Sequence, residues 1–228
     1  MTIPDGKGTW LAVFDNNGDV AGSISKRPNM LPLCDLLEEK GDEIFAAADS
    51  VVLECDLDKV LVKKVLELAK KHGKKIFALV SNISLAIERR DLLKQFDCFI
   101  CNKQEAGMFF IDDYTDKSRE EMRGILAGKV MQAQIPAMVV TLGAEGAVYA
   151  DLNGESGHCP AIEVLVKDTT GAGDAFCAGV SIGLTYGKTL RESIEIGSQL
   201  AASVITSSEN VCPRFLPKEL GLDIEVED

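Results

Sequence analysis

The sequence has no apolar stretch near the roughly 20 residues that a membrane-spanning helix needs, and its first residues lack the basic-then-apolar order of a signal peptide. Basic residues are outnumbered by acidic ones, which leaves a formal net charge of -12. Nonspecific nucleic-acid binding depends on many Lys and Arg side chains that displace counterions, so this class is disfavoured. We therefore expect a cytoplasmic protein that binds neither membranes nor nucleic acid.

Histidine is scarce, and the cysteines follow no pattern. With only His72 and His158, no Ser-His-Asp arrangement is convincing. The seven cysteines are odd in number and irregularly spaced, which is typical of reduced thiols. Cys98 and Cys101 have the spacing of metal ligands, but they lie on a predicted buried strand without a second pair. Core thiols are therefore favoured over a zinc site.

Strand and helix patterns alternate along the chain, without internal repeats or an obvious linker. A β-hairpin is expected first, with a turn at Asn-Gly, which suits positive φ. Alternation of strands and helices implies a mainly parallel sheet covered on both faces, with ligands at the carboxyl ends of the strands. Strands are expected at 9–14, 20–24, 51–53, 75–80, 97–101, 138–142, 146–150 and 157–160, and helices at 58–72, 85–94, 116–134, 173–186 and 190–206.

The expected fold is a three-layer α/β/α sandwich with a small N-terminal β-hairpin. We expect a single domain over residues 1–228. It would consist of the hairpin at 1–28, the α/β core at 29–222 and an acidic tail at 223–228.

The most informative motif is Asp-Thr-Thr-Gly-Ala-Gly-Asp-Ala-Phe at residues 168–176, between a predicted strand and a predicted helix. Glycine lets the backbone approach a ligand closely, and the start of a helix offers unpaired N–H groups to a phosphate. A carboxylate in the first turn, that of Asp174, could accept a proton from an attacking hydroxyl. For the bare Gly-Ala-Gly-Asp turn an alternative stays open, in which Asp174 only caps the helix.

The full string at residues 168–176 resembles the C-terminal signature of the ribokinase-like family of carbohydrate kinases, also called the PfkB family. The resemblance implies a ribokinase-like fold. It also implies that the backbone of Gly171, Ala172 and Gly173 forms an anion hole for the transferring phosphate, with Asp174 as the general base.

Two further segments fit the resemblance in family order. Asn102 and Glu105 are similar to the family's Asn-x-x-Glu motif, which implies that they hold magnesium through water. The alternative is a helix N-cap and its N3 partner. Thr141, Gly143 and Gly146 are similar to the family's Thr-x-Gly-x-x-Gly nucleotide loop. A tight turn that enters a hairpin is the alternative there.

The resemblance extends to the remaining nucleotide contacts. Asp168 and Thr170 would shape the turn together with the phosphate and cation site, and a monovalent cation such as K⁺ near Asp168 is common in the family. Ala201 lies on the late helix where the family flanks the adenine base, although small residues on a helix usually serve packing. The implied ligands are ATP, Mg²⁺ and a small-molecule sugar or nucleoside.

The branch of the family is less sharply defined. Residues 9–19 resemble the opening hairpin of pseudouridine kinases, and Val80-Ser81 before a basic helix also fits that branch. Two segments depart from it: residues 25–28 stand where an acidic, Met-containing segment is expected, and Ser84-Leu85 stand where a Lys is usual.

We expect ATP-dependent phosphorylation of a sugar or nucleoside hydroxyl. Family members usually carry a strand, a Gly-Gly segment and a sugar-binding Asp before the hairpin, whereas here eight residues precede Thr9 and no Gly-Gly pair occurs. We therefore expect ATP binding with poor acceptor phosphorylation, and an unpaired stretch of sheet that favours self-association into homo-oligomers or pairing with a partner strand. The alternatives are a non-catalytic nucleotide-binding or regulatory module and a dinucleotide oxidoreductase, which the lack of Gly-x-Gly-x-x-Gly after the first strand disfavours.

Overall fold

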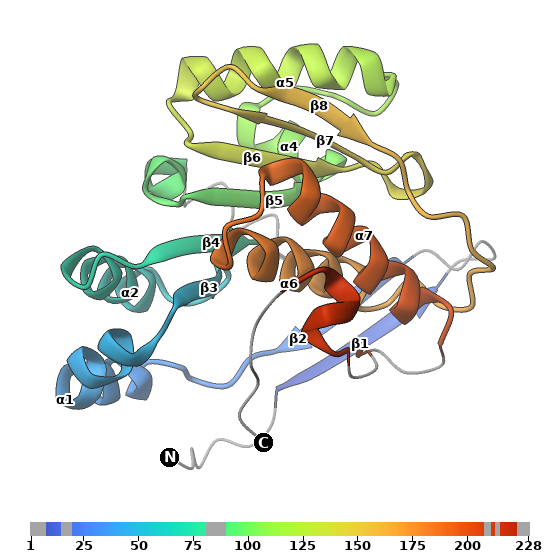
Figure 1. Ribbon diagram of the computed structural model, residues 1–228. Coiled ribbons are helices and arrows are strands. Elements are labelled where there is room, and N and C mark those ends of the chain that lie inside the picture. Colours follow the sequence, from blue (N-terminus) through green and yellow to red (C-terminus); the bar gives the residue numbers. More distant parts are fainter. Residues whose placement is uncertain (1–7, 15–19, 81–89, 208–210, 213–214, 223–228) are drawn as a thin grey trace. The chain divides into compact units, whose positions relative to one another are not determined.

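The structure of the protein is a computed structural model that describes residues 8–14, 20–80, 90–207, 211–212 and 215–222 (Figure 1). The chain divides into two compact units. The first comprises Met1–Ala48 with Leu57–Gly73, and the second comprises Asp49–Asp56 with Lys74–Asp228. No helix among the described residues is long and apolar enough to cross a membrane.

The first unit consists of a hairpin and two helices. The strands pair antiparallel, with Leu11 opposite Ile24, which confirms the expected hairpin. Its predicted turn at 15–18 lies outside the described residues. The elements of this unit are β1 (Thr9–Phe14), β2 (Val20–Lys26), α1 (Pro32–Ala47) and α2 (Lys59–Lys71).

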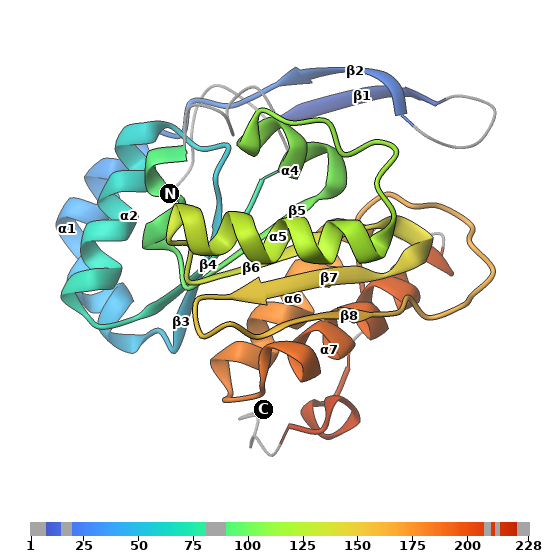
Figure 2. The same cartoon turned by 90° about the horizontal axis from the view of Figure 1, so that it is seen from above.

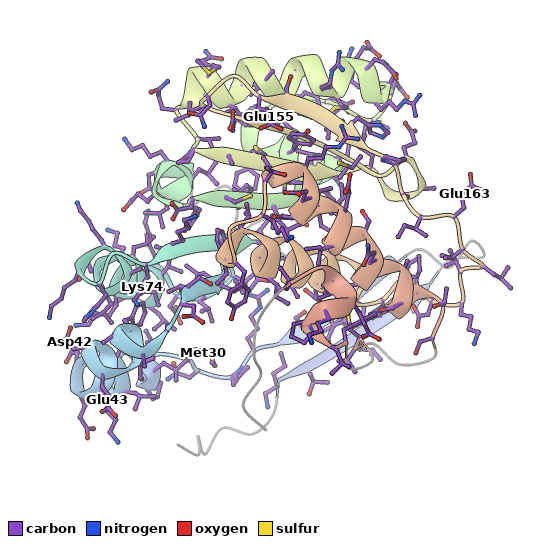
Figure 3. All side chains as sticks on the ribbon, in the orientation of Figure 1. Met30, Asp42, Glu43, Lys74, Glu155 and Glu163 are labelled. Carbon is purple, nitrogen blue, oxygen red and sulfur yellow. The ribbon has the colours of Figure 1, made fainter. Side chains whose placement is uncertain are left out.

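Helices α1 and α2 pack closely, and hydrogen bonds to the Asp42 carboxyl group link them. A Cβ added at Gly41 would lie 2.6 Å from Leu68 Cδ1, so a larger residue there would require the Leu68 side chain to move. Lys71 Nζ donates to Asp42 Oδ2 (2.7 Å), and His72 Nε2 lies 2.7 Å from Asp42 Oδ1. Asp42 is labelled in Figure 3. Both hydrogen bonds lower the pKa of the Asp42 carboxyl group, and the one from Lys71 has the larger effect.

The second unit is built on a six-stranded sheet in the order β3-β4-β5-β6-β7-β8. Strands β3 to β6 pair in parallel, whereas β7 pairs antiparallel with both β6 and β8, which confirms a mainly parallel α/β fold. The strands are β3 (Ser50–Glu54), β4 (Lys75–Leu79), β5 (Cys98–Asn102), β6 (Ala137–Thr141), β7 (Ala147–Asp151) and β8 (Ser156–Cys159).

Helices cover both faces of this sheet (Figures 1 and 2). On one side lie α4 (Lys103–Phe110) and α5 (Arg119–Ala133), and on the other α6 (Ala172–Thr185) and α7 (Leu190–Ile205). Successive side chains of β5 point to opposite faces of the sheet, so they contact the helices on both sides. Phe99 meets the Phe109 ring of α4 edge to face, with centroids 4.8 Å apart. Its neighbour Ile100 belongs to the core cluster that includes Phe176 and Val180 of α6.

Two predicted helices differ in extent from the observed ones. Within the stretch predicted as helical at 85–94, the described residues form a 3₁₀ helix at Arg90–Gln95, and 81–89 lie outside the described residues. The helix predicted to begin at residue 116 begins at Arg119, because Ser118 and Glu121 form a capping box there.

Glycines bring α6 and α7 into close contact. A Cβ at Gly179 would lie 2.6 Å from the Gly197 Cα atom, and a Cβ at Gly197 would lie 2.7 Å from the Phe176 carbonyl oxygen. One turn further along α6, a Cβ at Gly183 would lie 2.7 Å from the Ser193 Cα atom. Neither backbone can retreat without separating the helices, so these glycines set their spacing.

We expect Gly179→Ala to lower the free energy of unfolding by about 1–3 kcal/mol, because the added methyl group overlaps the backbone of α7. The control is Gly124→Ala in α5, where a Cβ meets nothing within 4 Å. That change should raise stability by up to about 1 kcal/mol through helix propensity. Urea denaturation of both variants measures the difference, and equal stability of the two would contradict the close packing.

Candidate active site

The Gly-rich turn at residues 168–173 leads into α6 and is hydrogen-bonded to the end of α7. The Lys167 N–H donates to the Ile205 carbonyl oxygen (2.7 Å). The Thr170 N–H donates to Asp168 Oδ1 (2.8 Å), which closes the turn. Gly171 then begins α6 with a φ of 81°, a left-handed conformation that side chains disfavour.

Two backbone donors are left free at the start of α6. The Ala172 N–H donates to the Thr169 carbonyl oxygen (3.2 Å), and the Ala175 N–H donates to the Gly171 carbonyl oxygen (2.9 Å). Between them, the N–H groups of residues 173 and 174 have no acceptor among the described residues. Free N–H groups at the positive end of a helix dipole form a natural binding site for an anion.

The carboxylate of Asp174 is also without a partner in the described part of the chain. It lies in the first turn of α6, yet no side-chain hydrogen bond caps that helix. The side chain is exposed, but the protein atoms around it remove part of its hydration, which raises the pKa of Asp174 above its ordinary value. A free carboxylate beside two free N–H donors could act as a base next to a bound anion.

A cavity of about 510 Å³ opens beside this helix start. Its walls come from the turn after β6, the loop before the Gly-rich turn, and helices α6 and α7. The lining includes six of the residues expected to contact the nucleotide or phosphate: Thr141, Gly143, Gly146, Ala172, Gly173 and Ala201. The cavity is not lined by the other expected residues, which are Asp168, Thr170, Gly171, Asp174, Asn102 and Glu105.

The turn after β6 depends on its two glycines. Gly143 has a φ of 61° and Gly146 a φ of 89°. A Cβ at Gly146 would overlap the Cys159 carbonyl oxygen, so this glycine lets the chain pass closely beside the end of β8. The expected turn into a hairpin and the expected nucleotide loop are thus the same segment, which both starts β7 and lines the cavity.

Sequence reasoning missed part of the apolar wall. Ile162, Val164 and Val166, which precede the Gly-rich turn, line the cavity together with Phe176 of α6. The alternate spacing of these apolar residues in a loop was an available signal, because apolar side chains in a loop need something to cover them. On its own that pattern is equally typical of a short strand.

Asn102 and Glu105 form a capping box at the start of α4. The Glu105 N–H donates to Asn102 Oδ1 (2.8 Å), and the Asn102 N–H donates to Glu105 Oε2 (2.7 Å). Glu105 is buried, with 7% of its surface exposed. Burial raises the pKa of Glu105 to about 7; the Asn102 hydrogen bond opposes this shift, while the Glu54 and Asp56 charges add to it.

We expect Glu105→Gln to stabilise the protein at pH 8. Because the folded-state pKa of about 7 exceeds the ordinary 4.5, the folded protein holds this proton more tightly. Stability contributed by the protonated form is therefore lost as pH rises from 4.5 to 7. Glutamine keeps the acceptor for Asn102 without the buried charge. The gain at pH 8 should be on the order of 2–3 kcal/mol at most, and should vanish near pH 4.

The control for this substitution is Glu121→Gln, at the same position of the capping box of α5. Glu121 is exposed, and the hydrogen bonds from Ser118 lower its pKa. Its replacement should therefore give no gain at pH 8. Urea denaturation at pH 4 and pH 8 compares the two variants. If Glu105→Gln were less stable than wild type at pH 8, burial of the Glu105 charge would not destabilise the folded protein.

Comparison with known proteins places this fold among ribokinase-like structures. The ribokinase of Arabidopsis thaliana, solved with ribose and ATP, matches with a TM-score of 0.72 and 19% identity over 89% of this chain and 64% of that one. Among sequences, the guanosine-inosine kinase of Exiguobacterium acetylicum is 34% identical over 92% of this chain and 69% of its own length. The pseudouridine kinase of Escherichia coli is 25% identical over 88% of this chain and 62% of its own length.

A model of the pfkB family of carbohydrate kinases matches residues 21–213. This chain belongs to the pfkB family of carbohydrate kinases, whose relatives here are kinases of sugars and nucleosides, as the sequence motifs indicated. It spans between 62% and 69% of the length of the three proteins just described.

Proposed function

We propose that this protein transfers the γ-phosphoryl group of ATP to a hydroxyl group of a sugar or nucleoside. The observation that carries the proposal is the start of α6. There the partner-free Asp174 carboxylate and two free N–H groups lie next to the cavity to which Gly173 contributes. In the ATP-bound state, the cavity would hold the base and ribose, and the start of α6 would face the γ-phosphate.

In this mechanism the acceptor oxygen bonds to the γ-phosphorus as the bond from phosphorus to the β–γ bridging oxygen breaks. The hydroxyl proton passes to Asp174, and ADP leaves. The N–H groups of residues 173 and 174 stabilise the charge on the transferring group. The anion hole was expected at Gly171, Ala172 and Gly173, but the Ala172 N–H already donates to the Thr169 carbonyl oxygen, so in this proposal residues 173 and 174 supply the donors. Thr141, Gly143, Gly146 and Ala201 line the nucleotide side.

The described residues contain no group of three or more His, Cys, Asp or Glu side chains that could hold a metal ion, so magnesium at the carboxyl end of β5 would depend on one carboxylate and on water. Glu105 Oε1 makes no hydrogen bond within the described residues, and Glu54 and Asp56 lie close enough to raise the Glu105 pKa. Magnesium binds carboxylate oxygens while keeping several waters. We propose that Asn102 and Glu105 hold it, so that Glu105→Gln raises the magnesium concentration needed for turnover. A monovalent cation such as K⁺ would lie near Asp168, whose pKa the Thr170 hydrogen bonds lower.

The competing proposal is a non-catalytic nucleotide-binding or regulatory module. Its support is that the cavity is lined by residues expected to contact the nucleotide, whereas Asp174 does not line it. Under both proposals the cavity binds a nucleotide, but only the first needs Asp174 as a base.

One assay separates the two proposals. The 228-residue chain is incubated with ATP, magnesium and one acceptor at a time, namely guanosine, inosine, pseudouridine or ribose. ADP release is followed, and the phosphorylated product is identified by mass spectrometry. Acceptor-dependent ADP release supports the kinase, and nucleotide binding without it supports the module. A catalytic efficiency of roughly 10⁴ M⁻¹s⁻¹ or more would contradict the poor acceptor phosphorylation expected from the sequence.

A further inference from the structure

The described residues that line the 510 Å³ cavity offer almost no side chain that could recognise one particular base. Among the described residues that line it there is no Asn, Gln, Lys, Arg, His, Tyr or Trp side chain. The one charged residue, Glu163, is exposed and lies at the outer edge of the loop that follows β8 (Figure 3). The remaining walls are glycine, apolar side chains and three hydroxyls.

The hydroxyls of Thr141, Thr169 and Ser198 are poor discriminators. A hydroxyl can both donate and accept, so it suits the edge of adenine as well as that of guanine. Ser198 Oγ already donates to the Ile194 carbonyl oxygen (3.0 Å), which leaves its lone pairs as acceptors. Adenine and guanine each present an exocyclic amino group that could donate to them.

The apolar walls likewise favour a flat ring of either kind. Ile162 and Val164 come from the loop, Phe176 from α6, and Ala202 and Ile205 from α7. Contact with such side chains is made through the face of a base, which all bases share. The volume also lies within the roughly 300–1,000 Å³ typical of small-molecule sites, so the amino group that guanine carries at C2 requires no new space.

We infer that the phosphoryl donor of this protein is a purine nucleoside triphosphate of either base type, with GTP used about as well as ATP. The inference rests on the proposed function, since it concerns the nucleotide end of the same site. Recognition by shape and apolar contact separates related ligands by roughly 10–200-fold, whereas a site built to pair with polar groups separates them by 10⁴-fold or more. Because both purines fill the cavity, we expect the lower end of the first range.

Direct binding tests the inference without relying on turnover. Isothermal titration of the full chain with the non-hydrolysable β,γ-imido analogues of ATP and GTP gives the two dissociation constants. We expect them to agree within about tenfold. A preference of about a hundredfold or more for either base would overturn the inference, because it would show that backbone groups of the loop read the base edge. A preference for adenine would leave the proposed function standing, and a preference for guanine would replace ATP as its donor. Failure of both analogues to bind would overturn both proposals.

Variants then show what sets the ratio of the two dissociation constants. Ala201→Leu fills part of the cavity and should weaken both analogues by the same factor, leaving the ratio unchanged. Glu163→Gln and Ser198→Ala should also leave the ratio unchanged. The control is Ser203→Ala on α7, which does not line the cavity. A ratio moved tenfold or more, or by about 1.4 kcal/mol, in Glu163→Gln or Ser198→Ala would identify a base-reading side chain and overturn the inference.

Discussion

Asp174→Asn should abolish most of the turnover and leave the nucleotide site intact. Loss of a general base lowers the rate by about two to four orders of magnitude. Affinity for the ATP analogue should change by less than about fivefold, because an exposed charge contributes little to binding. The asparagine side chain has nearly the same shape, and Asp174 makes no hydrogen bond within the described residues that its replacement would break.

The pH dependence of the rate gives a second readout. Asp174 must be ionised to accept a proton, and partial burial raises its pKa. As the pH is lowered, the wild-type rate should therefore begin to fall at a higher pH than it would with an aspartate of ordinary pKa. The residual activity of Asp174→Asn should lack that limb.

The control for this substitution is Asp35→Asn, which changes an acidic residue in the first turn of α1. It should keep the wild-type rate and pH profile. Rates are measured with whichever acceptor gives the highest wild-type turnover, and affinities by titration calorimetry. An Asp174→Asn protein that keeps most of the wild-type rate would exclude this residue as the base.

Gly173→Ala should separate stability from function. A Cβ added at Gly173 meets no atom within 4 Å, and the residue has an ordinary helical φ. Alanine is the better helix former, so the free energy of unfolding should stay the same or rise by up to about 1 kcal/mol. Gly173 nevertheless lines the cavity, and its N–H is one of the two free donors. The new methyl group would stand where a phosphate must come closest.

We therefore expect Gly173→Ala to lower turnover and weaken the ATP analogue by about one to two orders of magnitude, less than the roughly 10²–10³-fold cost of losing a donor, because the N–H group itself is kept. Gly124→Ala, a helical glycine that likewise meets nothing within 4 Å, is the control and should gain stability without loss of activity. Denaturation and calorimetry are run on both variants. Unchanged affinity of Gly173→Ala would place the phosphate elsewhere.

Much of the fold could be predicted from the sequence, because its signals are local. The buried parallel strands read as short apolar runs, and α7 was placed to within a residue, with Thr189 and Glu192 forming the capping box at its start. The extent of the helix expected at 85–94 was less well predicted. Its described residues form a 3₁₀ helix, a distinction of hydrogen-bond geometry that apolar spacing does not encode.

For the candidate site, the sequence by itself determined the family and the order of its motifs, because long strings such as residues 168–176 are specific. It did not separate the two readings of Asn102 and Glu105, since a capping box and a metal site use the same residue types at the same spacing. The tertiary structure added the capping box, the burial that raises the Glu105 pKa, and the partner-free state of Asp174 within the described residues. The capping box is local and was one of the two interpretations of the sequence, but burial depends on segments far apart in the chain.

The cavity is the clearest case of what only the tertiary structure decided. Its walls come from the turn after β6, the loop before the Gly-rich turn and two helices, which are spread over the sequence from Thr141 to Ile205. Gly179 and Gly197 look like ordinary small residues in the sequence, yet their mutual approach sets the spacing of the helices that form one wall. A sequence pattern records which residues share a face of their own element. The distance between two elements follows from how their surfaces fit, and that is a property of the packed structure alone.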